Sequence, residues 1–248
     1  AAEKQGVAIQ FDAKIDRIDI DAKTFRYETD GEYRTEPYER LIGSDGAGSA
    51  ARQAIVQQGL VHERSESLGH NYRELEIAPD ASGEFRLDAN SLHIWPRGGF
   101  MCIALPNTEK TFTVTLFLPA DGDVSFSHIQ SPVAARDFFR RYFPDALGLI
   151  ADFDHDWTNN PESRLSTLYL DTWHHQDSIV LIGDAAHAMV PFHGQGMNAC
   201  FEDCFELDRL LRAADDWRSA FEQFFELRKP DTDAIAAMAL ENFLEMRD

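Results

Sequence analysis

Alternating apolar and polar residues predict a strand at the start of the chain. Apolar side chains occupy every second position from Val7 to Ile15, which is the period of a half-buried β-strand. Ile18 and Ile20 continue the alternation in the shifted register that a bulge near Arg17 would produce. We therefore expect one bulged strand from about residue 7 to residue 20.

Two more strands are predicted directly after the first. Phe25 and Tyr27 mark the second strand, and Asp30–Gly31 is a residue pair typical of a tight hairpin turn. The third strand is expected to run from this turn to its end at Leu41–Gly43. Together the three strands would form a β-meander.

The pattern changes to closely spaced strands between residues 69 and 118. Short turns separate these strands, and no stretch there has the apolar period of a long helix. Because strands joined only by turns pair antiparallel, the region predicts an antiparallel sheet. The expected strands are His70–Ile77, Glu84–Leu87, Ser91–Trp95, Phe100–Leu105 and Thr111–Leu118.

Helix signals flank this sheet region on both sides. Ser49 is placed to cap a helix over residues 50–58, which Gly59 would end. After the sheet, Ser131–Pro132 opens a helix that would pack against it. A return strand is then expected from Arg164 to Thr172.

The most specific pattern follows that return strand. An apolar strand ends in Gly183–Asp184, a Pro- and Gly-rich loop comes next, and a helix begins near Gly196. The apolar residues of this helix predict one buried face, made of Phe201, Cys204, Phe205, Leu207, Leu210 and Leu211. Three helices are expected in all, over residues 196–213, 216–228 and 231–247.

A strand that ends in Gly-Asp before a glycine-opened helix is suited to a phosphorylated or dinucleotide-like ligand. Asp184 can accept hydrogen bonds from ribose or ribityl hydroxyls, and the free N–H groups after Gly194 and Gly196 lie at the positive end of the helix dipole. Glycine backbone can also approach a flat ring closely. The alternative is that Asp184 is the N-cap of a short turn. A metal site with His187 and His193 is disfavoured because no second carboxylate stands at ligand spacing, and His187 is better explained as a structural residue than as an acid or base.

The order of elements predicts a mixed α/β fold with two interleaved domains. A nucleotide-binding layer is expected from residues 1–66 and 176–229, and an antiparallel-sheet substrate domain, residues 67–175, is inserted between them. Residues 230–248 would begin a C-terminal helical segment.

Composition places the chain among globular proteins and narrows its partners. Apolar residues make up 44% of the 248 residues, which is enough for a buried core. The net charge of −20 disfavours nucleic acid and anionic membrane surfaces as partners, because both require positive patches. No apolar run is long enough to span a membrane. Cys200 and Cys204 lie one helical turn apart with no further cysteine nearby, so burial as small apolar side chains is favoured over a metal or redox pair.

Two motifs resemble those of the class A flavoprotein aromatic hydroxylases. Gly183–His187 together with Pro191–Asn198 resembles the second FAD-binding motif of that family, and Gly43–Arg52 resembles its Asp-Gly motif. The two stand in the family's order. Within the family, further stretches are similar to kynurenine 3-monooxygenases, so that the likeness covers nearly the whole chain. These stretches are His70–Leu75, Leu92–Arg97, Phe100–Asn107, Phe112–Phe117 and Met238–Met246.

The resemblance implies that the two motifs bind FAD and that NADPH reduces it. The implied FAD contacts are Asp45, Gly46, Arg52, Gly183, Asp184, Pro191, Gly194, Gln195, Gly196, Met197 and Asn198. Alternatively, Asp45–Gly46 is only a tight turn and Arg52 braces it. No catalytic side chain is implied, because the cofactor performs the hard step. In the family, O2 adds to the reduced flavin, and the resulting C4a-hydroperoxide hydroxylates the substrate ring.

The implied substrate is L-kynurenine, which kynurenine 3-monooxygenases hydroxylate to 3-hydroxykynurenine in tryptophan degradation. Its pocket should be mostly apolar with a few polar anchors. The implied lining residues are Ile103, Phe117, Phe192, His193, Asn242, Glu245 and Met246. Core packing is the alternative for Ile103, Phe117 and Met246, whereas Asn242 and Glu245 are three residues apart and share a helical face. A phenol or salicylate hydroxylase, and a non-catalytic domain without FAD, stay open as other functions.

One element of the family pattern does not occur in this sequence. The family begins with a strand and a Gly-x-Gly-x-x-Gly turn that holds the FAD pyrophosphate. We therefore expect the chain to be part of a longer protein and inactive by itself. The resemblance implies a cytoplasmic location in a bacterium, or the mitochondrial outer membrane in a eukaryote with the anchor outside this chain. The sequence predicts no oligomeric state.

Overall fold

The computed structural model describes residues 2–248, and these residues divide into two compact units. Unit 1 contains the residues up to 65 and residues 167–236, and unit 2 contains residues 66–166 and 237–248. The strands are β1 (Lys14–Asp19), β2 (Thr24–Thr29), β3 (Glu32–Pro37), β4 (Leu41–Gly43), β5 (Glu63–Ile77), β6 (His93–Pro96), β7 (Met101–Pro106), β8 (Phe112–Pro119), β9 (Ser163–Leu170), β10 (His174–His175) and β11 (Ile179–Leu181). The α-helices are α1 (Ala50–Gln57), α2 (Pro132–Tyr142), α3 (Pro144–Leu147), α4 (Phe153–Asn159), α5 (Asp184–His187), α6 (Gly196–Ala213) and α7 (Trp217–Arg247), and the 3-10 helices are η1 (Ala2–Gln5), η2 (Phe126–His128) and η3 (Pro191–His193).

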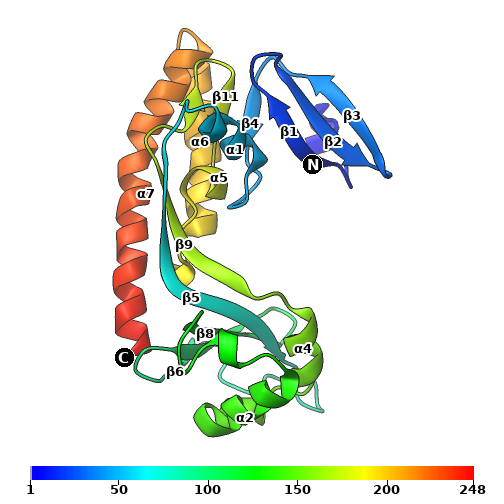
Figure 1. The fold of residues 1–248 in the computed structure, drawn as a ribbon, viewed down its shortest axis with the longest axis vertical. Helices are drawn as coiled ribbons and strands as arrows, with labels where there is room; N and C mark the ends of the chain where they lie inside the picture. Colours follow the sequence, from blue (N-terminus) through cyan, green and yellow to red (C-terminus); the bar gives the residue numbers. More distant parts are fainter. Residues whose placement is uncertain (1) are drawn as a thin grey trace. The chain divides into compact units, whose positions relative to one another are not determined.

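The first sheet of unit 1 is the meander β1–β2–β3, drawn in blue in Figure 1. Both pairings are antiparallel, and the register of β1 on β2 shifts between Ile15 and Arg17, so the predicted bulge is confirmed. Asp30 and Gly31 both have positive φ angles, 52° and 76°, as a two-residue hairpin turn requires. The predicted hairpin is therefore confirmed.

Two details of the predicted meander are wrong. The first strand begins at Lys14 rather than near Val7, and the apolar residues Val7, Ile9 and Phe11 before it are exposed. Lys14 pairs with Glu28 near the end of β2, so the residues before it have no partner strand in this sheet. The predicted third strand is in fact two strands, because β3 ends at Pro37 and β4 joins another sheet.

That second sheet of unit 1 has the strand order β10–β11–β4. β11 and β4 are parallel, with Leu181 opposite Gly43, while β10 is antiparallel to β11. Buried side chains of this sheet pack with α1 and with the first part of α7 in one apolar cluster, which includes Ile55, Ile179–Leu181, Phe221 and Phe224. This core holds the ends of β4 and β11 in place.

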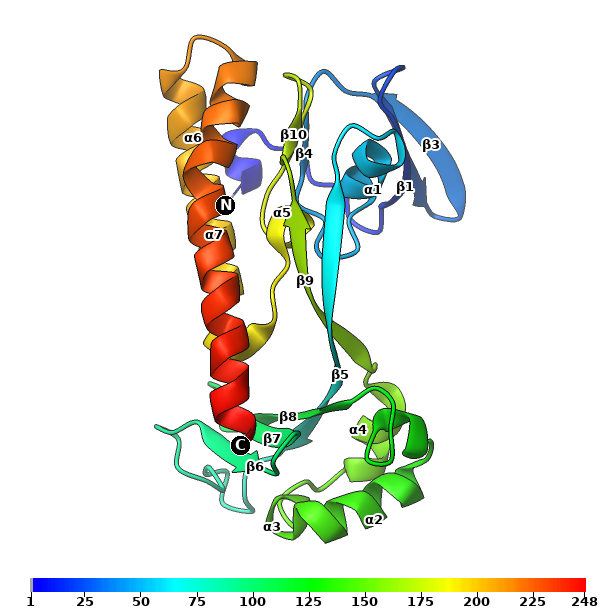
Figure 2. The ribbon, with the colours of Figure 1, turned by 60° about the vertical axis from the view of Figure 1, so that its left-hand side comes forward.

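Helices α6 and α7 lie side by side in unit 1 (Figure 2). Here the structure corrects two predictions. α7 is one helix of 31 residues rather than two, and it continues through Pro230. The buried face of α6 contains Ala199, Asp203, Leu207 and Leu210, so the predicted face was wrong in its first half: Phe201, Cys204 and Phe205 are exposed. A buried charged residue at position 203 explains the error, since the apolar pattern assigns charged residues to the outer face.

Unit 2 contains a five-stranded sheet in the order β6–β7–β8–β5–β9. β6–β7, β7–β8 and β8–β5 are antiparallel, which confirms the predicted antiparallel sheet. One face is covered by α2, α3 and α4, and Ser131 caps α2 by accepting from the Ala134 N–H. The strand predicted over residues 84–87 was wrong, because these residues form a loop without strand pairing. Phe85 and Leu87 pack on the core from that loop, which explains their apolar pattern.

The opposite face of this sheet carries a second set of buried side chains. Met101 lies opposite Phe117 in the β7–β8 register, Ile103 lies opposite Thr115, and none of these four belongs to the cluster under α2–α4. The end of α7 lies beside this sheet (Figure 2). Phe243 contacts the His70 ring edge-on at 5.2 Å, and the Gly98 N–H donates to the Arg247 carbonyl at 2.9 Å.

None of the helices formed by residues 2–248 is both long enough and apolar enough to span a membrane.

Candidate functional site

The two glycine–aspartate motifs lie at the ends of adjacent parallel strands. β4 ends at Gly43 and leads to Asp45, while β11 ends at Leu181 and leads to Asp184. Because Leu181 stands opposite Gly43 in a parallel pair, the two chains leave the sheet at the same edge. In open α/β sheets, ligands bind outside this carboxyl edge. Motifs that are far apart in the sequence therefore form one edge in unit 1.

A glycine allows each strand end to pack closely. A Cβ atom on Gly43 would lie 2.6 Å from the Ala51 Cβ and 2.8 Å from the Leu181 Cδ2. A Cβ atom on Gly183 would lie 2.6 Å from the Cys200 Sγ, and Gly183 also has a φ of +59°. Only glycine fits both the backbone conformation and the space at position 183.

The Asp45 carboxylate closes the N-terminus of α1. Its Oδ2 accepts from the N–H groups of Ala50 and Ala51 at 2.7 and 3.2 Å, and its Oδ1 accepts from the Ser49 hydroxyl at 2.5 Å. The Ser49 Oγ in turn accepts from the Arg52 N–H at 2.9 Å, which confirms the predicted cap. Asp45 thus serves the first turn of α1, where a negative charge is favoured by the helix dipole.

Arg52 is buried and joins the two motif segments. Its Nη1 donates to the Ala185 carbonyl in α5 at 3.1 Å, and its Nη2 donates to the Ala47 carbonyl at 2.5 Å. Its Nε donates to the Glu63 carboxylate at 2.8 Å. Each of the three guanidinium nitrogens thus donates to a partner within unit 1, as expected if Arg52 braces the turn.

Asp184 presents a different picture. It is the first residue of α5, behind Gly183 at the N-cap, so the predicted alternative of an Asp184 N-cap is wrong. Its carboxylate is exposed and accepts no hydrogen bond from the rest of residues 2–248. An exposed acceptor at a strand end is available to the hydroxyls of a ligand.

The N-terminus of α6 is open in the same way. Gln195 occupies the N-cap without a side-chain hydrogen bond to the helix, and its Oε1 accepts instead from the Asn198 Nδ2 at 2.8 Å. Gly194 has a φ of +65°, and a Cβ on either Gly194 or Gly196 would meet nothing within 4 Å. Met197 and Asn198 are exposed, as is Pro191 before the loop. The first turn of α6 therefore offers uncapped N–H groups to a ligand.

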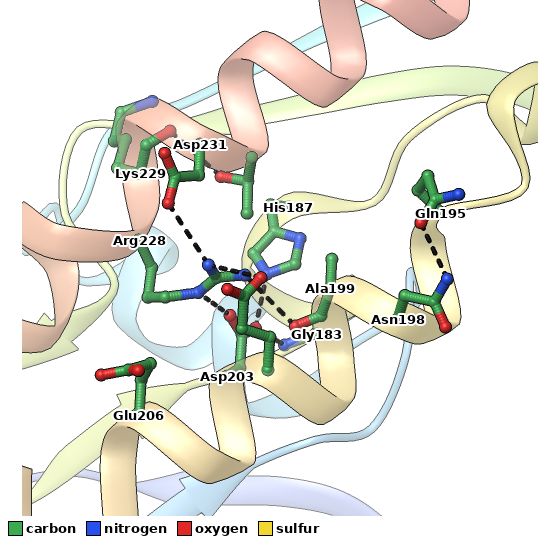
Figure 3. Close-up of polar contacts among 12 residues, drawn as sticks. Gly183, His187, Gln195, Asn198, Ala199, Asp203, Glu206, Arg228, Lys229 and Asp231 are labelled. Carbon is green, nitrogen blue, oxygen red and sulfur yellow. Dashed lines mark hydrogen bonds and ion pairs between the residues drawn. The ribbon is translucent and has the colours of Figure 1, made fainter. Parts of the chain in front are cut away.

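A buried carboxylate that the sequence analysis missed supports the second motif from behind (Figure 3). Asp203 of α6 is fully buried, and its Oδ2 accepts from the Gly183 N–H at 2.9 Å and from the His187 Nε2 at 2.6 Å. Its Oδ1 accepts from the Arg228 Nε at 2.9 Å. Burial by itself would raise the pKa of Asp203, but the hydrogen bonds from His187, Gly183 and Arg228 outweigh it and hold this pKa below its usual value.

Arg228 of α7 completes this cluster. It is 1% exposed, its Nη1 lies 2.8 Å from the Glu202 carboxylate and 3.5 Å from that of Asp231, and its Nη2 donates to the Ala199 carbonyl at 3.4 Å. His187 packs against Trp173, with ring centroids 4.9 Å apart. The expected structural role of His187 agrees with this burial. In the sequence, the spacing of Asp203 four and seven residues before Leu207 and Leu210 is the signal that could have placed it on their face of the helix.

The candidate substrate residues are distributed over both units. In unit 2, Phe117 is buried beside Tyr72 with ring centroids 6.1 Å apart, and Ile103 lies on the same face of the sheet. On α7 of this unit, Asn242 and Met246 are half-buried and Glu245 is exposed. In unit 1, Phe192 is buried and His193 is exposed, both in η3. Their common role in binding a substrate stays a prediction.

The three cysteines differ in burial. Cys102 is buried in the core of unit 2, and this burial raises the pKa of its thiol. Cys200 is half-buried against Gly183, and burial raises its pKa as well. Cys204 is exposed, so the predicted burial of this residue was wrong. Among residues 2–248, no three His, Cys, Asp or Glu side chains are arranged to hold a metal ion.

Comparison with known sequences places these features in a family. A family profile described as "FAD binding domain" matches residues 1–219. A protein of Stenotrophomonas maltophilia (strain K279a) named "Kynurenine 3-monooxygenase" is 51% identical over the whole of this chain. A protein of the same name from Xanthomonas axonopodis pv. citri (strain 306) is also 51% identical. The chain spans 55% of the length of each of these two relatives.

Solved structures resemble the fold at lower identity. The tetrameric form of 2-methyl-3-hydroxypyridine-5-carboxylic acid oxygenase superposes with a TM-score of 0.75 at 20% identity, covering 96% of this chain and 61% of that one. The Klebsiella pneumoniae HpxO structure, complexed with FAD and uric acid, gives a TM-score of 0.70 at 18% identity, covering 93% and 57%. The predicted mixed α/β fold is confirmed, and these two solved structures share it.

Proposed function

This chain belongs to the FAD binding domain family, and from that membership we propose that it is part of an FAD-dependent monooxygenase that hydroxylates L-kynurenine at the expense of NADPH and O2. The identity of 51% to proteins named kynurenine 3-monooxygenase is the observation that supports this substrate most strongly. Those relatives come from bacteria, and a cytoplasmic location is part of the proposal.

The edge formed by β4 and β11 has the features that an FAD site requires. The exposed Asp184 carboxylate can accept hydrogen bonds from ribityl hydroxyls, and the uncapped first turn of α6 can donate to the flavin or its phosphates. The open space at Gly194 and Gly196 leaves room for a flat ring against the backbone. Pro191, Gln195, Met197 and Asn198 belong to the same loop and helix turn, and we propose that they border the flavin.

The first motif plays a supporting part in this proposal. Because Asp45 closes the N-terminus of α1 and Arg52 holds the Ala47 and Ala185 carbonyls, both side chains shape the edge rather than extend from it. We infer that contacts of FAD with this motif are made by backbone around Asp45 and Gly46. Gly183 fixes the second turn in the same indirect way, through its close packing on Cys200.

The residues of this chain would bind and orient the two reactants. FAD, when bound and reduced by NADPH, supplies the activation of O2 that hydroxylation needs. We propose that Ile103 and Phe117 give an apolar surface to the substrate ring, and that Asn242, Glu245 and Met246 contribute the C-terminal part of the site. Phe192 and His193 are further candidate contacts. Apolar side chains around a reacting ring exclude water, and a few polar ones set its orientation.

Loss of the Asp184 carboxylate tests the cofactor site. In the full-length protein, Asp184→Ala should weaken FAD binding by about 1–3 kcal/mol, or up to two decades in affinity, because the ligand hydroxyls lose their acceptor. Titration of the apoprotein with FAD, followed by flavin fluorescence, measures this change. Asp21→Ala removes another exposed carboxylate of unit 1 and should leave the affinity unchanged. Equal affinities for wild type and Asp184→Ala would exclude the assignment.

A panel of aromatic acids tests the substrate. L-kynurenine should stimulate NADPH oxidation by the full-length protein, whereas a phenol or salicylate hydroxylase would respond to its own substrate instead. Replacing His193 or Asn242 by Ala should raise KM for kynurenine about tenfold while FAD stays bound, since a lost polar anchor costs about 1–3 kcal/mol. Misoriented substrate should also release more hydrogen peroxide per NADPH oxidised. A preparation that binds no flavin would favour the non-catalytic alternative.

A further inference from the structure

Asp203 stands behind the proposed cofactor site without being exposed to it. Its Oδ2 accepts from Gly183 at the start of α5 and from His187 at the end of α5. One oxygen atom therefore holds both ends of the five-residue segment Gly183–His187, which contains Asp184. Because Asp203 is a residue of α6, the same contacts also fix the position of that segment relative to α6.

We propose that Asp203 is a positioning residue for the cofactor site: through Gly183 and His187 it sets where the Asp184 carboxylate stands relative to the uncapped first turn of α6. The inference rests on the proposed function, since it takes these two features as FAD contacts. Asp203 itself is fully buried and would not touch the cofactor.

The chemistry of the contacts requires a carboxylate at this position. Three donors converge on two oxygen atoms: a backbone N–H, an imidazole and a guanidinium. An asparagine side chain has the same size, but its amide group places an N–H2 where one oxygen now accepts. At least one buried donor then loses its partner, and a buried donor without a partner is costly.

The effect of Asp203 on the turn at Gly183 can be separated from its effect on Arg228, because Arg228 has other carboxylate partners. Arg228 is also paired with Glu202 at 2.8 Å and with Asp231 at 3.5 Å. These two carboxylates would continue to hold the guanidinium after the Asp203 charge is removed. Gly183 has no such second acceptor for its N–H among the contacts of residues 2–248. Asp203→Ala, which removes both acceptor oxygens, therefore releases the turn at Gly183 more than it releases α7.

A purely structural role predicts a different outcome. If Asp203 only stabilised the packing of α6 on its neighbours, its replacement would lower stability and leave the site of the folded protein unchanged. Leu207 is buried in α6 one turn further on, in the apolar cluster that also contains Ala185 and Ala186, and its side chain makes none of the hydrogen bonds that hold Gly183 and His187. Leu207→Ala is thus a matched control for loss of stability alone.

The test compares FAD binding by apoproteins prepared from the full-length wild type, Asp203→Ala and Leu207→Ala. Binding is measured by flavin fluorescence at a temperature where circular dichroism shows each protein folded, and the visible absorption band of bound flavin is recorded. Asp203→Ala should raise the Kd for FAD about tenfold to a hundredfold and shift the bound-flavin band. Leu207→Ala should lower the melting temperature but keep the wild-type Kd and band.

His187→Leu is a second variant, for the case that Asp203→Ala does not fold. It removes one of the two bonds to Oδ2 and leaves the Asp203–Arg228 pair, so a smaller rise in Kd, about threefold to tenfold, is expected. The inference is overturned if the folded Asp203 or His187 variants bind FAD as wild type does, or if Leu207→Ala raises the Kd as much. Wild-type protein that binds no FAD would instead overturn the proposed function.

Discussion

The turns after β4 and after β11 have similar sequences, but the aspartate of the first binds groups of its own chain and the aspartate of the second is exposed. Asp45, after β4, accepts from two backbone N–H groups and one hydroxyl at the start of α1. Asp184, after β11, is exposed and accepts from no group among residues 2–248. The helices differ in the same sense, because α1 is capped by side chains and α6 is not.

This difference shows how a strand end can be either a structural joint or a binding surface. At the first turn, the protein satisfies its own donors and acceptors, so little binding capacity remains. At the second turn, the backbone is supported from behind by the buried Asp203, and the outward groups stay unsatisfied. A motif match alone does not separate these two cases, whereas the hydrogen bonds do.

The largest expected effect comes from a methyl group at the two strand-end glycines. Gly183→Ala combines a contact of 2.6 Å with the Cys200 Sγ and a φ of +59°, so the overpacking cost of about 1–3 kcal/mol is joined by backbone strain of about 1–3 kcal/mol. Gly43→Ala should incur the overpacking cost alone. Urea denaturation of the apoproteins measures both, with Gly48→Ala, which meets nothing within 4 Å, as the control. A smaller loss of stability in Gly183→Ala than in Gly43→Ala would contradict this order.

Breaking the link between the two turns should have the next largest effect. Arg52→Lys keeps the positive charge but cannot reach Glu63, Ala47 and Ala185 at once. We expect a loss of about 2–3 kcal/mol of unfolding free energy, because buried carbonyls lose a charged donor. Arg212→Lys, at an exposed pair with Asp208, should cost less than about 0.5 kcal/mol. Similar losses for the two variants would show that Arg52 does not join the turns.

Replacing the two aspartates should have different effects on stability as well as on FAD binding. Asp45→Ala removes the acceptor of the Ala50 and Ala51 N–H groups in the first turn of α1 and should lower the unfolding free energy of the apoprotein by about 1–2 kcal/mol. Asp184→Ala should change this free energy by less than about 0.5 kcal/mol, since the residue is exposed and makes no hydrogen bond to the chain. Chemical denaturation of both variants without FAD checks the contrast. A large loss in Asp184→Ala would make that residue structural too.

The smallest expected effect is a pH dependence specific to the strand beside β11. Burial lowers the pKa values of His174 and His175 in β10 below their usual 6.5, and the His174 ring lies 6.4 Å from that of Phe221. Below about pH 6.5 the unfolded chain therefore binds more protons at these two residues than the folded chain does. The free energy of unfolding is unaffected by them above about pH 6.5 and decreases as the pH falls towards the folded pKa values. Denaturation at pH 7.5 and 5.5 should show this loss. Replacing both histidines with glutamine should reduce the difference, and an unchanged pH dependence would contradict the assignment.

Local signals in the sequence predicted the elements that local contacts determine. The Asp30–Gly31 turn, the Ser49 cap and the Ser131 cap depend on groups within a few residues of one another, and all three are confirmed. The strand–turn–helix around Gly183 was predicted for the same reason. Both aspartate motifs were recognised as site candidates, although the sequence did not separate the capping role of Asp45 from the exposure of Asp184.

The features that the sequence did not predict depend on partners far along the chain. Residues 7–11 alternate as a strand does, but a strand also needs a neighbouring strand to pair with. The pairing of β1 with β2 begins at Lys14, so β2 offers no partner to the residues before it. Asp203 and Arg228 are separated by 25 residues, so no spacing rule joins them. Helix α7 continues through Pro230 beside the buried Arg228 contacts, which hold this region of the helix to α6. Tertiary contacts decide each of these cases against the local pattern.

The three cysteines differ in burial, so one of them can be labelled selectively. An electrophilic reagent should modify the exposed Cys204 well before the buried Cys102, whose raised pKa keeps its thiol protonated. Cys204 directly follows Asp203 in α6. A fluorophore or spin label attached there, without any engineered residue, would report changes in the surroundings of α6 as a cofactor enters or leaves.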